Sequence, residues 1–298
     1  HGPAMGTIIE GCPAGVEFDQ ALLATRLLQR RPGQNPFVSD RQEMDQPKVV
    51  SGVYEGKTLG TPICVIIENM DQRSKDYDEI KQQPRTGHAD DMWELKYEHQ
   101  DHRGGGRSSG RETVARVIGG AIAEMFLKST FPELKVTAFT DQVFDLKVPQ
   151  AKITQWMSDD ELYKRSLNSP VRCPDEHLSE QIQSLLLQAK EEGQSYGGVA
   201  GLVIENVAAG LGEPVFDKFK SRLASACMGV GATTGFEFGA GFSAPTIEGT
   251  QFHSNPKSQR YGGIRGGITT GEPIFARVAF KPTSSVMDVA KKGRHDPC

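Results

Sequence analysis

The chain has little cysteine, no long apolar run and no excess of positive charge, and each absence excludes a class of protein. Its five cysteines are far apart and never form a C-x-x-C pair, so neither a zinc site nor a disulfide framework is predicted. No apolar run approaches the roughly 18 residues of a membrane helix. The net charge of −4 argues against a general nucleic-acid binder. We therefore expect a cytoplasmic protein with reduced thiols and no membrane, nucleic-acid or metal partner.

The segment pattern of the 298 residues predicts one α+β domain. No low-complexity linker divides the chain, so we expect a single domain over 1–298, with both termini trimmed. Helix and strand patterns cluster rather than alternate, which favours α+β over a doubly wound parallel sheet. Helices are expected at 19–30, 111–128, 159–166, 175–192 and from Pro214, and strands at 47–69, 134–148, 199–207, 236–248 and 264–280. Ile67-Glu68-Asn69 and Ile204-Glu205-Asn206 end comparable strands, which suggests an internal repeat.

The most informative feature is the glycine- and arginine-rich stretch from Asp101 to Thr113. Three consecutive glycines lie between arginines, and a helical pattern follows at once. Ser109 and Glu112 stand three residues apart, as a capping box requires. Backbone N–H groups at a helix start favour an anion, and guanidinium groups fork onto phosphate or carboxylate. A solvated basic loop is the alternative, but the combination of arginines, serines and a helix start favours an anion site. The arginines are Arg103, Arg107 and Arg111.

Four further segments contain candidate chemical groups. His88 lies in a polar loop beside an arginine and is a candidate general acid, with a structural histidine as the alternative. A lysine and three hydroxyls follow a predicted strand at 281–285 and suit phosphate binding or a plain turn. Glycines at 262–267 allow a flat ligand to approach closely, or simply form tight turns. Residues 294–296 join a cation, an imidazole and a carboxylate, where surface charge pairing is the alternative.

Together these segments resemble the chorismate synthase family, and they follow the family's order over nearly the whole chain. The family carries G-E-S-H-G, R-P-G-H-A-D, R-G-G-G-R-S-S-A-R-E-T, G-G-I-x-G-G-I, K-P-T-S-S and G-R-H-D-P-C. The corresponding residues are 1–2, 85–90, 103–113, 262–268, 281–285 and 293–298. Thr86 and Gly110 replace the family's usual proline and alanine, and Pro36 stands where many members have an arginine.

The resemblance implies an activity and an assembly. Members of this family convert 5-enolpyruvylshikimate 3-phosphate to chorismate and phosphate by a 1,4-trans elimination in the shikimate pathway of aromatic amino acid biosynthesis. They need reduced FMN although the reaction is redox-neutral. The implied fold is a β-α-β sandwich, with antiparallel sheets layered between helices, and the implied assembly is a homotetramer.

The resemblance also implies roles for individual residues. His1 would be the acid near the departing phosphate, His88 would hold or protonate the reduced flavin, and Asp296 would relay the proton that leaves the substrate. The residues implied to bind FMN are Arg107, Ser108, Ser109, Gly231, Ala232, Gly266, Lys281, Pro282, Thr283, Ser284, Ser285 and Arg294. The residues implied to bind the substrate anions are Arg30, Arg31, Arg41, Arg85 and Arg111.

One alternative stays open at the level of sequence, and another is excluded by composition. A non-catalytic phosphate- or nucleotide-binding module could use the same arginine and glycine loops, but it would not need the acid–base residues His1, His88 and Asp296. An RNA binder of the RGG type would be basic and of low complexity, and this chain is neither. No G-x-G-x-x-G follows a predicted strand, which favours an external flavin reductase over flavin reduction by the protein's own use of NADPH.

Overall fold

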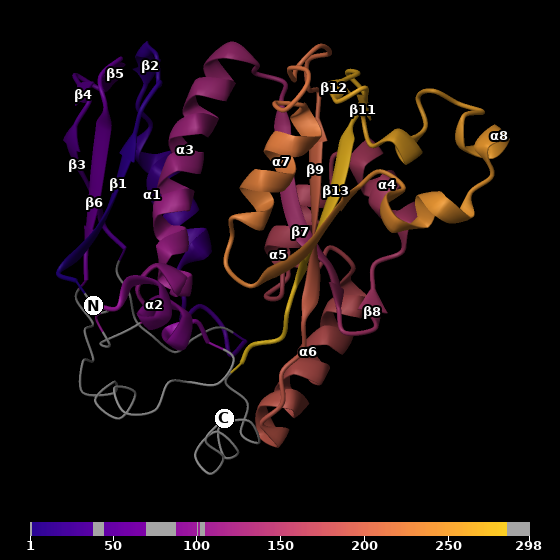
Figure 1. Cartoon of the computed structure of the whole chain (residues 1–298), viewed down its shortest axis with the longest axis horizontal. Helices are drawn as coiled ribbons and strands as arrows, with labels where there is room; N and C mark the ends of the chain where they lie inside the picture. Colours follow the sequence, from indigo (N-terminus) through magenta and orange to yellow (C-terminus); the bar gives the residue numbers. More distant parts are fainter. Residues whose placement is uncertain (1, 38–44, 70–87, 100, 102–104, 285–298) are drawn as a thin grey trace. The chain divides into compact units, whose positions relative to one another are not determined.

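A computed structural model describes residues 2–37, 45–69, 88–99, 101 and 105–284. The chain divides into two compact units, with Glu133 as the first residue of the second (Figure 1). Every strand pair in the described residues is antiparallel, and helices cover the sheets, which confirms the predicted α+β class. The single domain over 1–298 stays a prediction.

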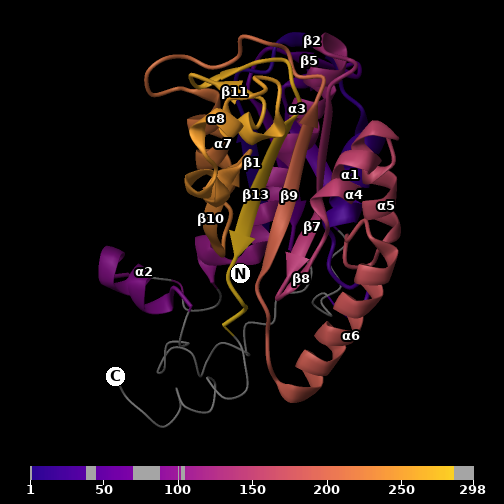
Figure 2. The ribbon, with the colours of Figure 1, turned by 90° about the vertical axis from the view of Figure 1, so that its right-hand side faces the viewer.

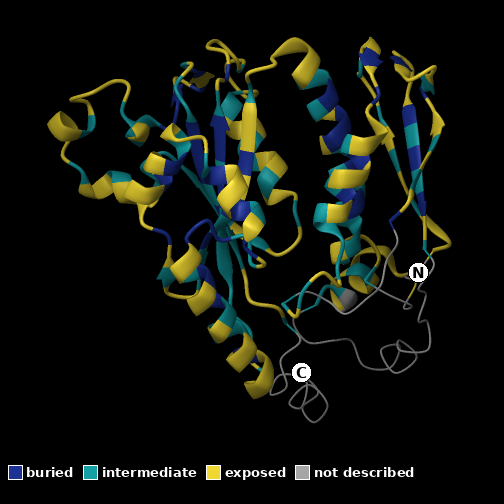
Figure 3. Ribbon diagram, turned by 180° about the vertical axis from the view of Figure 1, so that it is seen from behind, coloured by how far each residue is buried: buried dark blue, intermediate teal, exposed yellow. Residues whose placement is uncertain are grey.

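The first unit builds its core from two small sheets and two helices. The larger sheet has the order β1 (Ala4–Ile9), β6 (Ile63–Glu68) and β3 (Pro47–Ser51), and the smaller one β2 (Ala14–Glu17), β5 (Lys57–Leu59) and β4 (Val53–Tyr54). Alternate residues of β6 are buried, as a half-buried strand requires. They pack with the apolar stripes of α1 (Gln20–Arg30) and α3 (Thr113–Thr130), whose buried sides are visible in Figure 3. Each fully buried Leu or Ile contributes about 1.5–3 kcal/mol.

An ion pair aligns α1 with α3. Arg26 donates from Nε and Nη2 to the two carboxylate oxygens of Glu124, at 2.7 Å each. These hydrogen bonds outweigh the effect of burial and hold the pKa of Glu124 below its usual value. One turn further along α1, Arg30 contacts Thr113, the first residue of α3. The two helices are therefore antiparallel, and the end of α1 lies beside the start of α3.

The start of α3 differs from the predicted capping box. Two short 3₁₀ turns, η2 (Gly106–Ser108) and η3 (Gly110–Glu112), precede the helix. Ser109 caps η3 by accepting a hydrogen bond from the Arg111 N–H at 3.2 Å. Glu112 instead accepts from Arg116 Nε at 2.7 Å. The capping box was wrong because Glu112 turns toward the next helical turn, where an oppositely charged partner lies four residues on.

The second unit is a five-stranded sheet between helices. Its order is β10 (Thr233–Phe238), β13 (Ile274–Phe280), β9 (Gly198–Glu205), β7 (Lys135–Val143) and β8 (Leu146–Lys147). One face carries α4 (Gln150–Ser158), α5 (Leu162–Asn168) and α6 (Glu176–Glu192), and α7 (Phe219–Met228) covers the other (Figure 2). Val203 packs toward α4, α5 and α6, and Ile204 packs toward α7. Successive side chains of β9 therefore contribute to the cores on opposite faces of the sheet. This arrangement confirms antiparallel strands layered between helices.

The remaining short elements lie between β10 and β13 in the chain. They are η4 (Gly241–Thr246), α8 (Gly249–Phe252), η5 (Gln259–Tyr261), β11 (Ile264–Arg265) and β12 (Ile268–Thr269). The strand predicted over 236–248 was too long, because η4 takes over after Phe238. The helix predicted from Pro214 begins only at Phe219, and α4 was not predicted at all. None of the helices in the described part of the chain is long and apolar enough to cross a bilayer.

The suggested internal repeat has a structural counterpart. Asn69 follows β6 and donates from Nδ2 to the carbonyl of Gly2 at 2.8 Å. Asn206 follows β9 and donates from Nδ2 to the carbonyl of Glu133, also at 2.8 Å. Each carbonyl lies shortly before the neighbouring antiparallel strand, β1 or β7. The two asparagines therefore close equivalent strand ends in the two units.

Candidate functional site

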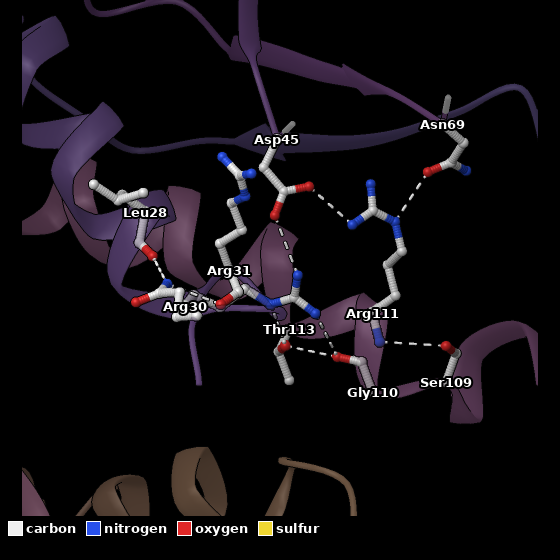
Figure 4. Close-up of polar contacts among 10 residues, drawn as sticks. Leu28, Arg30, Arg31, Asp45, Asn69, Ser109, Gly110, Arg111 and Thr113 are labelled. Atoms are coloured by element: carbon white, nitrogen blue, oxygen red, sulfur yellow. Dashed lines mark hydrogen bonds and ion pairs between the residues drawn. The ribbon is translucent and has the colours of Figure 1, made fainter. Parts of the chain in front are cut away.

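The candidate site of the first unit lies where α1 ends, β6 ends and α3 begins (Figure 4). Arg30 is the last residue of α1, and Arg111 lies in η3. Both guanidinium groups meet one carboxylate, that of Asp45, which lies just before β3. Arg30 Nη1 lies 3.2 Å from Asp45 Oδ2, and Arg111 Nη1 lies 2.8 Å from Asp45 Oδ1.

Each arginine has further contacts that set the plane of its guanidinium group. Arg30 donates from Nε to Thr113 Oγ1 at 3.3 Å and from Nη2 to the Gly110 carbonyl at 3.5 Å. Arg111 donates from Nε to Asn69 Oδ1 at 3.0 Å. The Thr113 hydroxyl in turn donates to the Gly110 carbonyl at 2.6 Å. The two planes are therefore set by α1, β6 and the turn before α3.

The cluster is largely withdrawn from water and, counted over the described residues, carries excess positive charge. The Asp45 side chain is 1% exposed, Arg30 18% and Arg111 15%. Two cations share one anion, and Arg31 adds another guanidinium at the end of α1. Within the described residues the Arg31 side chain forms no hydrogen bond or ion pair. Its backbone N–H donates to the Leu27 and Leu28 carbonyls, and its own carbonyl accepts from Gln34 Nε2 at 2.8 Å. Such a cluster suits a multiply charged anion.

The glycine-rich turns place the first group of predicted flavin residues next to this cluster. Arg107 and Ser108 lie in η2 and are exposed, and Ser109 links η2 to η3. Trp93 of α2 (Asp90–Tyr97) donates from Nε1 to Ser108 Oγ at 2.5 Å. His88 is partly buried and stands shortly before α2. The structure therefore links the predicted residue His88 to Ser108 through one short helix.

The second unit brings together another group of predicted flavin residues. The Ala232 carbonyl accepts a hydrogen bond from the Lys281 N–H at 3.0 Å. Lys281 Nζ lies 3.5 Å from Ser284 Oγ, so Gly231-Ala232 and Lys281–Ser284 form one group at the end of β13. Ser195, which the sequence did not indicate, donates to the Thr283 carbonyl at 2.9 Å.

Gly197 makes the close approach of this segment possible. A Cβ there would lie 2.6 Å from the Phe280 carbonyl oxygen and 3.2 Å from Pro282 Cδ. Gly266, in contrast, is separate from this group. It adjoins Gly267, whose carbonyl accepts from the N–H of Phe219 at the start of α7. Ala232 follows the other end of this ten-residue helix, about 15 Å away.

Several predicted residues lie outside the described ranges: His1, Arg41, Arg85, Ser285, Arg294 and Asp296.

Asp45 was missed by sequence reasoning, because nothing in the polar run before β3 distinguishes it from a solvated acid. The thiols of buried Cys173 and partly buried Cys227 take no part in the site. Burial raises the pKa of Cys173 to about 11 and also raises that of Cys227, so both stay protonated near neutral pH. Among the described residues no cluster of three or more His, Cys, Asp or Glu could hold a metal ion.

Comparisons with known proteins give one answer along the whole chain. The family model for chorismate synthase matches residues 1–298. The chorismate synthase of Bdellovibrio bacteriovorus is 52% identical over 302 residues, which span 100% of this chain and 86% of that protein. The chorismate synthase of Cytophaga hutchinsonii is 41% identical over 327 residues, which span 100% of this chain and 87% of that protein. A solved structure titled "Crystal Structure of Chorismate Synthase" is 31% identical with a TM-score of 0.77, and covers 98% of this chain and 85% of that one.

Proposed function

This chain belongs to the chorismate synthase family and is a lyase of the shikimate pathway, and from this premise we propose that it converts 5-enolpyruvylshikimate 3-phosphate to chorismate and phosphate. The 1,4-trans elimination removes phosphate from C3 and a proton from C6 of the substrate ring. No net oxidation or reduction occurs, because the electron pair of the broken C–H bond replaces the one that leaves with phosphate.

The observation that carries this proposal is the arginine pair held on Asp45. The substrate has one phosphate and two carboxylates, and desolvated guanidinium groups bind such oxyanions with charge-assisted hydrogen bonds. Arg30 and Arg111 are mostly buried and lie beside the start of α3, whose dipole adds positive potential. We assign Arg31, Arg41 and Arg85 to the same substrate, on the family resemblance.

We assign reduced FMN as the cofactor, and the described residues fit its phosphate. The ammonium of Lys281 and the hydroxyl of Ser284 lie together beside Gly231-Ala232, and both can donate hydrogen bonds to a phosphate. These residues, Pro282 and Thr283 would hold the cofactor with Arg107, Ser108, Ser109, Ser285 and Arg294. Gly266 would contact a different part of it. When bound, reduced FMN supplies reversible electron donation without net redox change.

We assign the proton transfers to three residues. His1 protonates the departing phosphate, His88 holds or protonates the reduced flavin, and Asp296 takes up the proton from substrate C6. Each group type suits its task, since imidazole titrates near neutral pH and an ionised carboxylate can accept a proton. The arginine cluster orients the substrate and helps to exclude water from it.

An anaerobic assay with chemically reduced FMN tests the proposed function. We expect chorismate and phosphate in equal amounts, with no reductant consumed. Oxidised FMN in air without reductant should yield no chorismate. Chorismate formed under those conditions, or one reductant consumed for each chorismate, would contradict the reaction. A protein that binds the substrate but never converts it would instead support a non-catalytic phosphate-binding module.

We propose that an external reductase supplies the reduced flavin and that the enzyme works in the cytoplasm. The absence of a G-x-G-x-x-G motif after a strand supports external reduction. Cys12, Cys64, Cys173 and Cys227 all have free thiols, as a reducing compartment allows.

We propose a homotetramer, and the outer face of the β1-β6-β3 sheet supports contact between copies. Ile8 on β1 is 69% exposed and Val50 on β3 is 54% exposed. Between them β6 contributes Cys64 and Ile66, neither of which is charged, and Gly6 pairs with Ile66. Lys48 of β3 lies opposite Ile66 and is a charged residue on the same face. The apolar residues of this face suit burial against a second copy of the chain.

Replacing Ile8 with lysine should dissociate the assembly. A charge on this face would be buried without a partner in the interface, so light scattering should show a smaller particle than the wild type. The circular dichroism spectrum should stay unchanged, because Ile8 is exposed within one chain. Leu187 of α6, 45% exposed, offers a control, and Leu187→Lys should leave the particle size unchanged. Unchanged size in Ile8→Lys would rule out this interface.

A further inference from the structure

We propose that Asp45 is a positioning residue for the substrate: its carboxylate sets the spacing and orientation of the Arg30 and Arg111 guanidinium groups. This inference rests on the proposed function, in which these two arginines bind the substrate anions. Asp45 lies between the two guanidinium groups, and each of its carboxylate oxygens contacts one of them (Figure 4). It therefore acts through the arginines and takes no part in the chemistry.

The geometry makes Asp45 a shared partner. Each of its two oxygens accepts from a different arginine, Oδ2 from Arg30 and Oδ1 from Arg111. The arginines are 15 and 66 residues away in the sequence and belong to different elements. A single carboxylate thus fixes the distance between a helix end and a 3₁₀ turn. The 1% exposure of its side chain means that water does not compete for these hydrogen bonds.

Charge explains why such a partner is needed. Two partly buried guanidinium groups repel each other, and without an anion between them they would separate toward solvent. One carboxylate reduces the charge of the group from two positive to one positive. The remaining charge still attracts an oxyanion, while the repulsion that would spread the arginines is removed. The pair is therefore already in place before the substrate arrives, and less ordering is required on binding.

The other contacts of the arginines show that Asp45 completes an existing frame. Asn69 holds Arg111 from the Nε side, and Thr113 holds Arg30 from its own Nε side. Asp45 joins the two Nη1 atoms across the gap between them. Its backbone φ of 44° lies in the left-handed region, which non-glycine residues rarely adopt. Such a conformation persists where the surroundings require it, and here it places the carboxylate between the two cations.

Asp45→Asn isolates the charge, because asparagine has the same shape and also tolerates a left-handed backbone. Its amide nitrogen would face a guanidinium donor, so one arginine loses its partner. We expect KM for 5-enolpyruvylshikimate 3-phosphate and the Kd from equilibrium dialysis to rise about tenfold or more, the usual scale for one lost charged hydrogen bond. We expect kcat to change less than about threefold, since proton transfer is untouched.

Asp141 provides a matched control in the second unit. Its side chain is also 1% exposed, and it pairs with Arg277 Nε at 2.8 Å. Asp141→Asn should lower Tm about as much as Asp45→Asn and leave substrate KM and Kd unchanged. A Kd and KM at the wild-type value in folded Asp45→Asn would overturn the inference. So would an equal rise of KM in Asp141→Asn, because the effect would then be general destabilisation.

Asp45→Glu covers the case in which Asp45→Asn does not fold. Glutamate keeps the charge but moves the carboxylate by one methylene, so both guanidinium groups must shift. We expect KM to rise about threefold to tenfold, on the scale of a misplaced charged contact. An unchanged KM would overturn the inference. If the wild-type protein binds the substrate without converting it, the proposed reaction is refuted but the role of Asp45 is not. Equilibrium dialysis then still measures how each Asp45 variant changes the substrate Kd. A wild type that does not bind it refutes both.

Discussion

Replacing Arg111 with alanine is expected to weaken substrate binding by about 2–5 kcal/mol, the range for truncating one partner of a buried, hydrogen-bonded charge pair. The Arg111 side chain is 15% exposed and is held by Asp45 and Asn69, so its charge faces a ligand anion with little competing water. The variant also leaves Asp45 with Arg30 alone, so the remaining guanidinium group is less well oriented. A substrate titration of the wild type and the variant measures the effect.

Arg116 supplies the control for this prediction. Arg116 lies in the first turn of α3, shortly after Arg111 in the chain. Its side chain is 43% exposed and forms an ion pair with Glu112. Exposed pairs of this kind contribute about 0.3–0.5 kcal/mol, so Arg116→Ala should barely change stability and should not change substrate affinity. Far-UV circular dichroism must show that Arg111→Ala is folded. Substrate affinity equal to that of the wild type in folded Arg111→Ala would exclude Arg111 from the binding site.

Replacing Asp296 with asparagine should lower the single-turnover rate by roughly 10²-fold or more, the scale of a lost general acid–base group. A carboxylate accepts a proton, whereas an amide of the same shape does not at neutral pH. Asparagine keeps the size and most hydrogen bonding, so FMN and substrate should still bind. Asp296 lies outside the described residues, and this prediction rests on the match of 293–298 to the family motif.

The alternative for Asp296 is a structural one, in which it only orients Arg294. That alternative predicts the opposite pattern, with weak ligand binding and a normal rate at saturation. Binding and single-turnover rate measured on the same anaerobic sample separate the two. A near-normal single-turnover rate would remove Asp296 from the proton-transfer residues.

Elements with strong local signals were predictable from the sequence. For α1, Asp19 accepts from the Leu22 N–H at 2.9 Å and so caps a helix with a clear apolar stripe. For α6, Asp175 caps the start and Gly193 ends the helix with a φ of 68°. Elements without such signals were missed. The helix α4 has no side-chain cap, and its two buried residues form too weak a pattern to predict it.

The glycine-rich segment shows the same limit at the site. Its motif and its position before a helix were readable from consecutive residues. The capping of this helix start was not predictable from the sequence. The Glu112 carboxylate accepts a hydrogen bond from Arg116 and not from Ser109, because a 3₁₀ turn that forms only in the folded chain lies between Ser109 and α3. Gly266 likewise matched its motif, but the length of α7 separates it from Ala232.

The sequence by itself determined the family, the class of reaction and the elements whose periodicity and caps are local. Motifs and helix caps depend on neighbouring residues, so their information is present in short segments. Tertiary structure alone decided that Asp45 lies between Arg30 and Arg111. That contact depends on how α1 packs against α3, through the Arg26–Glu124 pair and the apolar core between them. An ion pair between distant residues has no local signature, because its energy depends on burial and distance, and both are set only when the chain has folded.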